Sequence, residues 1–211
     1  MFEYYNEHFL EVTGVTLARG EYGENNLWMR LFVKEHGIIS VTARQGMGDT
    51  EPFEWGTFYL KKKQRGHTYF VNEIDIRDDM LHLRRSREQL ITALKWSDTL
   101  LKYLVPEQPD DELLTNLYWN MKLLAESKIP PEILDWRFLW RWLELWGLAP
   151  EIISFHTSHK FNNDEIILLA HVSQLNTKGV IKLFTSPIST NIRENAFKVA
   201  SNLAAKFLNE K

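Results

Sequence analysis

The chain has 211 residues, of which 44% are hydrophobic and 25% are charged, and its formal net charge is -3 at pH 7. These values predict a globular chain of one or two domains, in which any binding of nucleic acid would need a local cationic patch. The sequence has no cysteine, no apolar run of membrane-spanning length and no signal-peptide pattern, which excludes disulfides and thiolate zinc sites and predicts a cytoplasmic protein.

The sequence changes character near residue 78. Eight of the ten glycines precede this point, and leucine-rich sequence with a helical period follows it. We therefore expect an α+β chain with a β domain at residues 1–78 and an all-α domain at residues 79–211. The junction is too short to act as a flexible linker.

Five strands are expected in the first domain, separated by turn-forming residues. In the second of them, Trp28 and Arg30 alternate with Leu27 and Met29, so the two pairs face opposite sides of a sheet. Five short strands favour a small closed barrel, because closure removes exposed edges. Periodicity alone leaves an OB-fold and an SH3-like barrel as alternatives. The expected strands are residues 12–19, 27–35, 38–44, 53–62 and 68–75.

The helical domain is expected to pack around one tryptophan-rich helix at residues 131–146. This segment is apolar over nearly its whole circumference and holds four of the eight tryptophans, as buried helices do. Pro131 suits its first turn and Gly147 suits its end. The other expected helices are residues 79–104, 110–127, 163–175 and 190–208, with a short one at 178–184.

Several short segments of the chain match one known family pattern in their order and spacing, over a range from about Val12 to Ile152. They are Tyr22-Gly23-Glu24, Leu31-Phe32, Glu35-His36-Gly37-Ile38, Glu51-Pro52-Phe53, Arg137-Phe138 and residues 147–152. Together these segments resemble the RecO family. The resemblance implies an OB-fold followed by a helical domain. It also implies a DNA repair and recombination mediator that anneals single-stranded DNA. Together with RecR, such a protein loads recombinase on DNA coated by single-strand-binding protein.

Two segments depart from the family pattern. Many members carry a four-cysteine zinc knuckle where this chain has residues 153–160, so we expect no metal cofactor here. His156 and His159 have a spacing that metal ligands use, but no third ligand is evident. The loop after the third strand, typically long and basic in the family, is the short and slightly acidic segment 44–51. This weakens the case for DNA binding by that loop.

Two cationic clusters are candidates for DNA contact. The turn between the fourth and fifth strands is cationic in a region, residues 1–79, that holds nine Lys and Arg against thirteen Asp and Glu. A solvated turn that discourages edge pairing is an equal alternative. The second cluster lies at the expected start of the first helix, where positive charge opposes the helix dipole. With two tyrosines as stacking platforms, the candidates are Arg44, Tyr59, Lys61, Lys62, Lys63, Arg65, Tyr69, Arg84, Arg85 and Arg87.

Arg137, Arg141 and Trp140 on the tryptophan-rich helix are candidates for protein binding. The resemblance implies that the helical domain binds the acidic, phenylalanine-ending tail of single-strand-binding protein. Such a tail needs a cation for its carboxylates and an apolar pocket for its ring. We expect Arg137→Ala to abolish tail binding with little change in melting temperature. Alternatively, both arginines reach the surface and pair with Glu144 or Asp135.

No motif of catalysis stands out. The chain has no phosphate-binding glycine loop and no serine in a nucleophile elbow. We therefore expect a protein that acts by binding rather than as an enzyme. The alternative to a DNA-binding mediator is an interaction scaffold with a RecO-like fold and weak or no affinity for DNA.

Overall fold

The computed structural model describes residues 9–46, 50–62, 68–126, 129–152, 161, 163–176, 178–179 and 193–209. The chain divides into two compact units. The first comprises Met1–Leu81 with Ser97–Leu114, and the second comprises His82–Trp96 with Thr115–Lys211. The first unit therefore includes helical sequence, residues 97–114, in addition to the β domain that was expected at residues 1–78.

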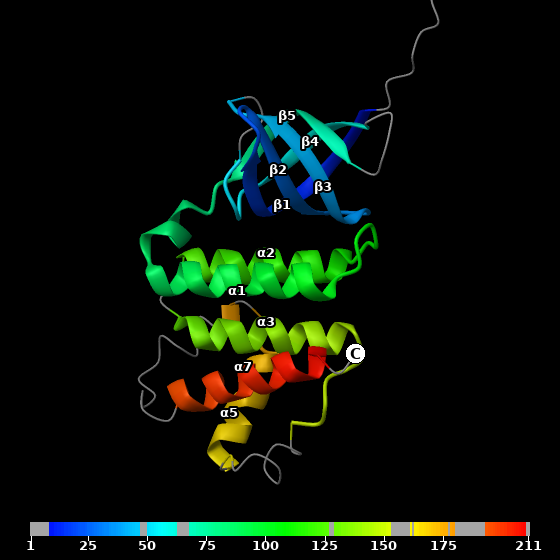
Figure 1. Cartoon of the computed structure of the whole chain (residues 1–211). Coiled ribbons are helices and arrows are strands. Elements are labelled where there is room, and N and C mark those ends of the chain that lie inside the picture. The colour runs from blue at the N-terminus through cyan, green and yellow to red at the C-terminus, as the bar shows by residue number, and fades with distance from the viewer. Residues whose placement is uncertain are drawn as a thin grey trace, which may run out of the picture. The chain divides into compact units, whose positions relative to one another are not determined.

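Five strands form a closed barrel in the first unit, in the order β1-β2-β3-β5-β4 (Figure 1). Neighbouring strands are antiparallel except for the β3–β5 pair, which is parallel and, among the described residues, is joined at two residue pairs. This arrangement confirms the expected α+β class with an OB-like barrel preceding the helices. The strands are β1 (Phe9–Tyr22), β2 (Asn26–Val33), β3 (Gly37–Arg44), β4 (Trp55–Lys62) and β5 (Tyr69–Asp78).

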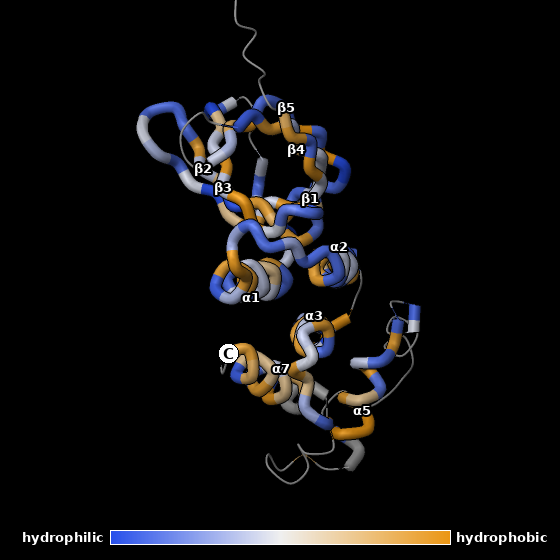
Figure 2. The backbone as a smooth tube through the Cα atoms, turned by 90° about the vertical axis from the view of Figure 1, so that its right-hand side faces the viewer, coloured by the Kyte–Doolittle hydropathy of each residue, from blue (hydrophilic) through white to orange (hydrophobic). Residues whose placement is uncertain are grey.

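Aliphatic side chains from all five strands fill the barrel. In Figure 2, both hydrophobic and hydrophilic residues occur along the strands, as expected for a sheet with one face in the core and the other toward solvent. On β2 the residues at odd positions are buried in this core, which leaves Trp28 and Arg30 on the outer face. The core comprises Val12, Leu27, Met29, Leu31, Val33, Ile39, Val41, Ala43, Phe58, Leu60 and Val71.

Residues 97–114 attach to the outside of the barrel within the first unit. The Ser97 hydroxyl donates a hydrogen bond of 2.7 Å to the carbonyl oxygen of Leu17, and both residues are buried. The amide of Glu107 donates one of 3.0 Å to the carbonyl oxygen of Ile38. Phe32 belongs to the outward-facing set of β2, yet it is fully buried. The barrel therefore has an apolar core inside and a second buried patch outside.

The turn between β2 and β3 requires a glycine. Gly37 has φ +69°, and a Cβ added to it would lie 2.0 Å from the backbone oxygen of Gln108. Glu35 in the same turn also has positive φ, and its amide donates a 2.8 Å hydrogen bond to the Asp111 carboxylate. The Glu35-His36-Gly37 segment of the family resemblance thus docks residues 108–111 on the barrel.

The second unit is helical. Helix α3 packs against α7 and α5 (Figure 1). The expected central helix is confirmed, because ten of the residues of α3 are buried, and the Trp136 indole donates to the carbonyl oxygen of Leu169 on α5. The elements are η1 (Leu81–Arg85), α1 (Arg87–Tyr103), α2 (Asp111–Glu126), α3 (Pro131–Leu145), α5 (Asn163–Gln174) and α7 (Arg193–Asn209).

Helix α1 begins later than expected. Residues 81–85 form a separate 3-10 turn, and the amide of Gln89 reaches the hydroxyl of Ser86, which caps α1 instead of an aspartate. Asp78 and Asp79 accept backbone hydrogen bonds from Met80 and Leu81 at the start of the 3-10 turn. The expectation of one continuous helix from residue 79 was wrong. The two aspartates cap the 3-10 turn and Ser86 caps α1, so the segment forms two separate elements.

Helix α3 has the expected ends. Pro131 occupies its first turn, and Gly147 has φ +68° just beyond its last residue. The amide of Leu148 donates to the carbonyl oxygen of Leu143 at 2.8 Å, which satisfies a terminal carbonyl. The helix expected at 178–184 and the cap of the one at 190–208 lie largely outside the described residues. In the described part of the chain, no helix has the length and apolarity of a membrane span.

Candidate nucleic-acid interface

The outer surface of β2 and β3 carries cations beside an exposed aromatic ring. Trp28 is 40% exposed, and Arg30 and Arg44 are also exposed. Trp28 pairs with Thr42 across the two strands, and Arg30 pairs with Ser40. Directly paired residues share one face of a sheet, so these side chains and Arg44 lie on the same outer surface. A guanidinium nitrogen of Arg30 donates a hydrogen bond to the Ser40 hydroxyl, which holds it at the sheet surface.

This surface continues across β5 to β4. Thr42 pairs with Phe70 in the parallel ladder, and Phe70 pairs with Lys61 across β4 and β5. Phe70 and Lys61 therefore lie on the same side as Trp28. We call this surface the cationic aromatic face, defined as Trp28, Arg30, Ser40, Thr42, Arg44, Phe70 and Lys61.

The barrel surface farther along β4 and β5 has the opposite charge. Tyr59 points outward, and its paired neighbours are Glu11 on β1 and Glu73 on β5. Two positions farther along β5, Asp75 is also exposed. Carboxylates repel phosphates, so the predicted stacking residue Tyr59 has an unfavourable setting for DNA.

The other predicted barrel residues are divided between the core and the strand ends. Tyr69 packs against the barrel core, so its ring is not part of the cationic aromatic face. Lys62 is exposed at the end of β4. Lys63 and Arg65, at the tip of the predicted cationic turn, lie outside the described residues, as do His156 and His159. Among the residues that are described, no group of three or more His, Asp or Glu side chains is placed to hold a metal ion.

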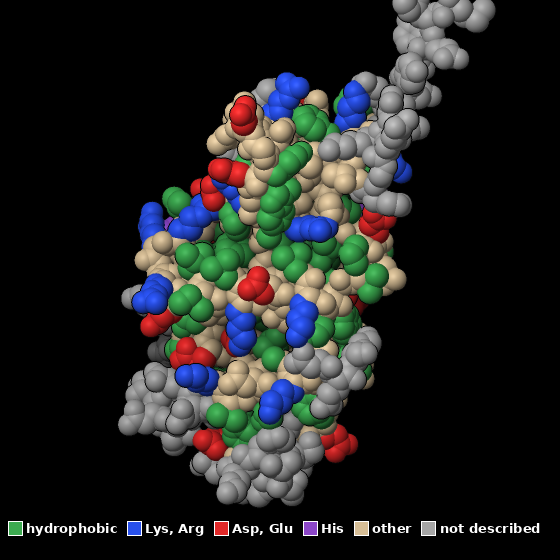
Figure 3. Space-filling view, viewed as in Figure 1, with side chains coloured by type: hydrophobic (Ala, Val, Ile, Leu, Met, Phe, Trp, Pro, Cys, Tyr) green, Lys and Arg blue, Asp and Glu red, His purple; other side chains and the backbone are tan. Residues whose placement is uncertain are grey.

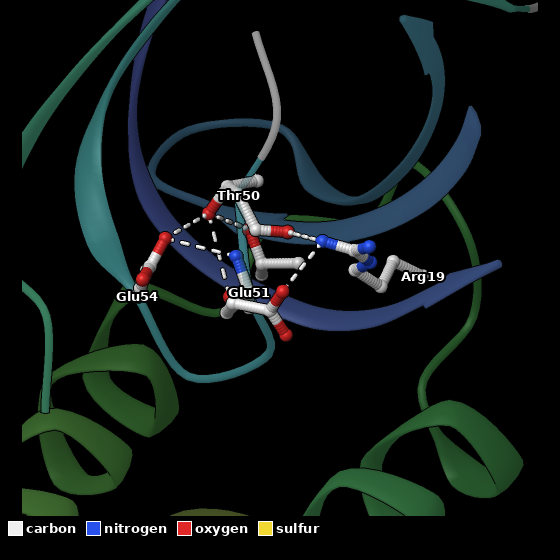
Figure 4. Close-up of polar contacts among 5 residues, drawn as sticks. Arg19, Thr50, Glu51 and Glu54 are labelled. Atoms are coloured by element: carbon white, nitrogen blue, oxygen red, sulfur yellow. Dashed lines mark hydrogen bonds and ion pairs between the residues drawn. The ribbon is translucent and has the colours of Figure 1, made fainter. Parts of the chain in front are cut away.

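The described part of the loop between β3 and β4 carries a network of polar contacts around two glutamates (Figure 4). Its Glu54 carboxylate accepts hydrogen bonds of 2.8 Å from the Thr50 hydroxyl and 2.9 Å from the Glu51 amide. Arg19 on β1 forms a 2.8 Å ion pair with Glu51. The amide of Phe53, a buried residue, donates to the carbonyl oxygen of Thr16. The described part of this loop thus holds its carboxylates in a hydrogen-bonded network.

The predicted cationic cluster before α1 belongs to the second unit. Arg84 and Arg85 lie on the 3-10 turn, where a guanidinium nitrogen of Arg85 lies 3.4 Å from the His82 ring. Arg87 is the first residue of α1, and its side chain is exposed. These three arginines remain candidates for contact with an anionic partner.

Arg137, the leading candidate for tail binding, is a buried cation. It is 8% exposed, and its guanidinium donates a 2.6 Å hydrogen bond to the side-chain oxygen of Asn120 on α2. Burial lowers the pKa of Arg137 below its ordinary value, and the charge of Arg141 lowers it further. The Nε group of Arg137 is buried with no hydrogen-bond partner among the described residues.

Arg141 and Trp140 are joined through one carboxylate. Arg141 is exposed and forms a 2.6 Å ion pair with Glu144, whereas the alternative to tail binding expected both Arg137 and Arg141 at the surface. The other oxygen of Glu144 accepts a 2.8 Å hydrogen bond from the Trp140 indole, which is itself buried. Asp135 pairs instead with Lys95 and the Trp96 indole. Of the three candidates on α3, Arg141 is the one that an acidic peptide can reach from solvent.

From the sequence, Trp28 was considered as a stacking residue but was assigned to the barrel core, and Arg30 was not considered as an interface residue. The sequence pattern of β2 could have shown that both residues face outward. Leu27 and Met29 lie in the core, so Trp28 and Arg30, which alternate with them, must lie on the opposite face of the strand. Figure 3 shows, on the face that it draws, Lys and Arg interspersed with Asp and Glu rather than gathered in one large patch. A nucleic-acid site on this molecule has to be local, as the sequence analysis anticipated.

No model of a protein family matches the chain. Two curated relatives do. The DNA repair protein RecO of Desulfatibacillum aliphaticivorans is 21% identical over 148 residues, which is 66% of this chain and 57% of the relative. The DNA repair protein RecO of Bacillus subtilis (strain 168) is 26% identical over 149 residues, which is 66% of this chain and 56% of the relative.

The chain is RecO-like. The resemblance found in the sequence motifs is thereby confirmed. The matches span little more than half the length of these two curated relatives. The order of the RecO-like chain, an OB-like barrel before a helical unit, agrees with the fold that the resemblance implied.

Proposed function

We propose that this RecO-like chain is a DNA repair protein that binds single-stranded DNA on the cationic aromatic face of its barrel. The observation that carries the proposal is the combination of exposed Arg30 and Arg44 with a 40% exposed Trp28 on one sheet surface. OB-folds use the surface of their second and third strands to bind oligonucleotides, and the two relatives are named as DNA repair proteins.

The chemistry of this face suits a flexible polyanion. Arg30, Arg44 and Lys61 supply cations for phosphates, and Trp28 and Phe70 supply rings on which bases stack without regard to sequence. The acidic surface around Tyr59 repels the strand and confines it to the β2–β3 side. Affinity is therefore expected to depend on salt and only weakly on sequence.

By its resemblance to RecO, we further propose a mediator role in the cytoplasm, without catalysis. In that role the protein anneals single strands and, with RecR, helps to load recombinase on DNA coated by single-strand-binding protein. The acidic tail of that protein would be bound on α3 through exposed Arg141, beside Trp140 and Arg137. The ion pair of Arg141 with Glu144 would have to open to admit the tail.

A second candidate function has its own support. The carboxylates of Glu11 and Glu73 and the acidic β3–β4 loop are unusual on a DNA-binding barrel. They favour a protein-interaction scaffold that keeps the RecO-like fold and binds DNA weakly or not at all.

Oligonucleotide binding at several salt concentrations decides between the two functions. We expect Arg30→Gln and Arg44→Gln each to weaken binding and to lower the slope of log K against log salt by about 0.7. The matched control is Arg77→Gln, which removes an exposed arginine from β5 next to Asp75 and leaves the slope unchanged. Absence of binding at low salt by the folded wild type would establish the scaffold function instead.

A further inference from the structure

A cavity of about 440 Å³ lies on the outer surface of the barrel next to Trp28. Its volume is within the range of about 300–1,000 Å³ of pockets that hold small organic molecules. Every lining residue belongs to the first unit. Five of the seven are apolar, and the other two are the indole and the guanidinium of the cationic aromatic face. The lining residues are Ala18, Trp28, Arg30, Ile38, Leu101, Leu104 and Pro106.

Gly20 determines where the indole of Trp28 can lie. The two residues pair across β1 and β2, and a Cβ added to Gly20 would come within 2.6 Å of two atoms of the Trp28 ring. The ring therefore rests on the backbone of β1, where a larger residue would displace it. Because Trp28 remains 40% exposed, part of its surface is available to a ligand.

We propose that this cavity receives one unpaired nucleobase of a single strand, stacked on Trp28, with a flanking phosphate at Arg30. The inference rests on the proposed function and assigns it a specific pocket. The apolar lining suits the faces of a base, and none of the lining residues carries a carboxylate. Arg30 lies two residues from Trp28 on the same strand, and Arg44 lies diagonally across on β3, so cations flank the ring on both sides.

The pocket makes the protein selective for single strands. A base in a duplex is stacked and paired, and to enter the cavity it would have to be extruded, which loses its stacking and pairing energy. Arginines contact the phosphates of either form of DNA. Binding through cations alone would therefore not distinguish the two forms, whereas binding that includes the pocket favours the unpaired strand.

The test compares a fluorescent single strand with a duplex of the same length at one salt concentration. We expect Trp28→Ala to weaken single-strand binding about 5- to 150-fold, the range given by 1–3 kcal/mol per stacked base at tenfold per 1.4 kcal/mol. Duplex binding should change little, and Trp28→Phe should restore most of the loss. Ala18→Phe, which fills the cavity while keeping Trp28 and Arg30, should have the same effect as Trp28→Ala.

Trp119→Ala is the matched control, because Trp119 is 48% exposed on α2 and does not line the cavity. Circular dichroism and melting curves verify that each variant is folded. If folded Trp28→Ala and Ala18→Phe bind the single strand as tightly as wild type, the pocket proposal is contradicted, whereas single-strand binding through Arg30 and Arg44 stands. If the wild type binds neither form of DNA, both fail. Equal losses of affinity for the single strand and for the duplex would likewise contradict the pocket proposal.

Discussion

Arg137 shows how an arginine can be buried with a neutral amide as its hydrogen-bond partner. Its guanidinium donates to the Asn120 amide oxygen, and the Asn120 nitrogen in turn donates to the backbone oxygen of Asn116 at 2.7 Å. Asn116 itself donates to the carbonyl oxygen of Phe138 on α3. Neutral amides thus solvate the cation, which joins α2 to α3 through a chain of polar contacts inside an apolar unit.

Replacing Arg137 by alanine is expected to lower the free energy of unfolding by about 1–3 kcal/mol. The change leaves the buried oxygen of Asn120 without its donor, which is costly in an apolar interior. At about 2–4 °C per kcal/mol for a chain of this size, differential scanning fluorimetry detects the shift. This result would differ from the small shift expected from the sequence.

Arg141→Ala is the matched control for that measurement. Arg141 is exposed and its ion pair with Glu144 lies at the surface, so its loss should change stability by less than about 1 kcal/mol. The same two variants, titrated with an acidic tail peptide, separate stability from binding. Tail affinity that falls for Arg141→Ala at unchanged melting temperature supports the proposed site. Equal melting of both variants would contradict the structural role of Arg137.

At the scale of elements, the turn between β2 and β3 couples a local conformation to a distant segment. Position 37 requires a glycine for two reasons: its φ is positive, and the backbone of Gln108 lies where a Cβ would be. The sequence indicated the first requirement, because His36-Gly37 separates two alternating runs. It did not indicate the second, because nothing local to residue 37 encodes its contact with residue 108.

Gly37→Ala is expected to destabilise the protein more than Gly46→Ala does. Both glycines have positive φ, so both changes carry a backbone penalty of roughly 1–2 kcal/mol. A Cβ on Gly46 would meet nothing within 4 Å, whereas one on Gly37 would force the backbone of Gln108 away. Chemical denaturation of the two variants measures the difference. Equal losses of stability would mean that the Gln108 contact adds nothing.

The strands and α3 were predictable from the sequence because alternation and apolar periodicity report burial directly. The start of α1 was not, because Ser86 and Asp79 are both competent caps and only the folded backbone shows that each is used. The exposure of Trp28 was hard to predict for a related reason. Phe32 occupies an outward-facing position of β2, as Trp28 does, yet it is buried. Alternation along a strand therefore does not show which outward-facing side chains are buried and which are exposed to solvent.

At the scale of the whole molecule, the boundary between the two units passes through α1 and α2. Residues 97–114 belong with the barrel in the structure, although their helical pattern assigns them to the second domain in the sequence. A helical period shows that a segment forms a helix but not which neighbours it packs against. Contacts such as Ser97 with Leu17, 80 residues apart, lie beyond any local pattern.

A fragment of residues 1–78 is therefore expected to be much less stable than a fragment of residues 1–114. The shorter piece lacks the hydrogen-bond partners of Leu17 and Ile38, which are Ser97 and Glu107. Thermal unfolding followed by circular dichroism, with hydrophobic dye binding as a second signal, compares the two. A cooperative transition at the same temperature in both fragments would support the boundary near residue 78 that the sequence predicts.

The short β3–β5 ladder has a consequence for how partners can bind. Beyond its two residue pairs, the edge of β3 is covered at Ile38 by Pro106, which forms a parallel bridge with it. The remaining edge of β5 carries exposed charges, among them Glu73 and Arg77. Covered and charged edges discourage β-augmentation, in which a peptide adds itself as an extra strand. Partners of this barrel should therefore be recognised by side chains, and their specificity should follow charge and ring stacking rather than backbone pairing.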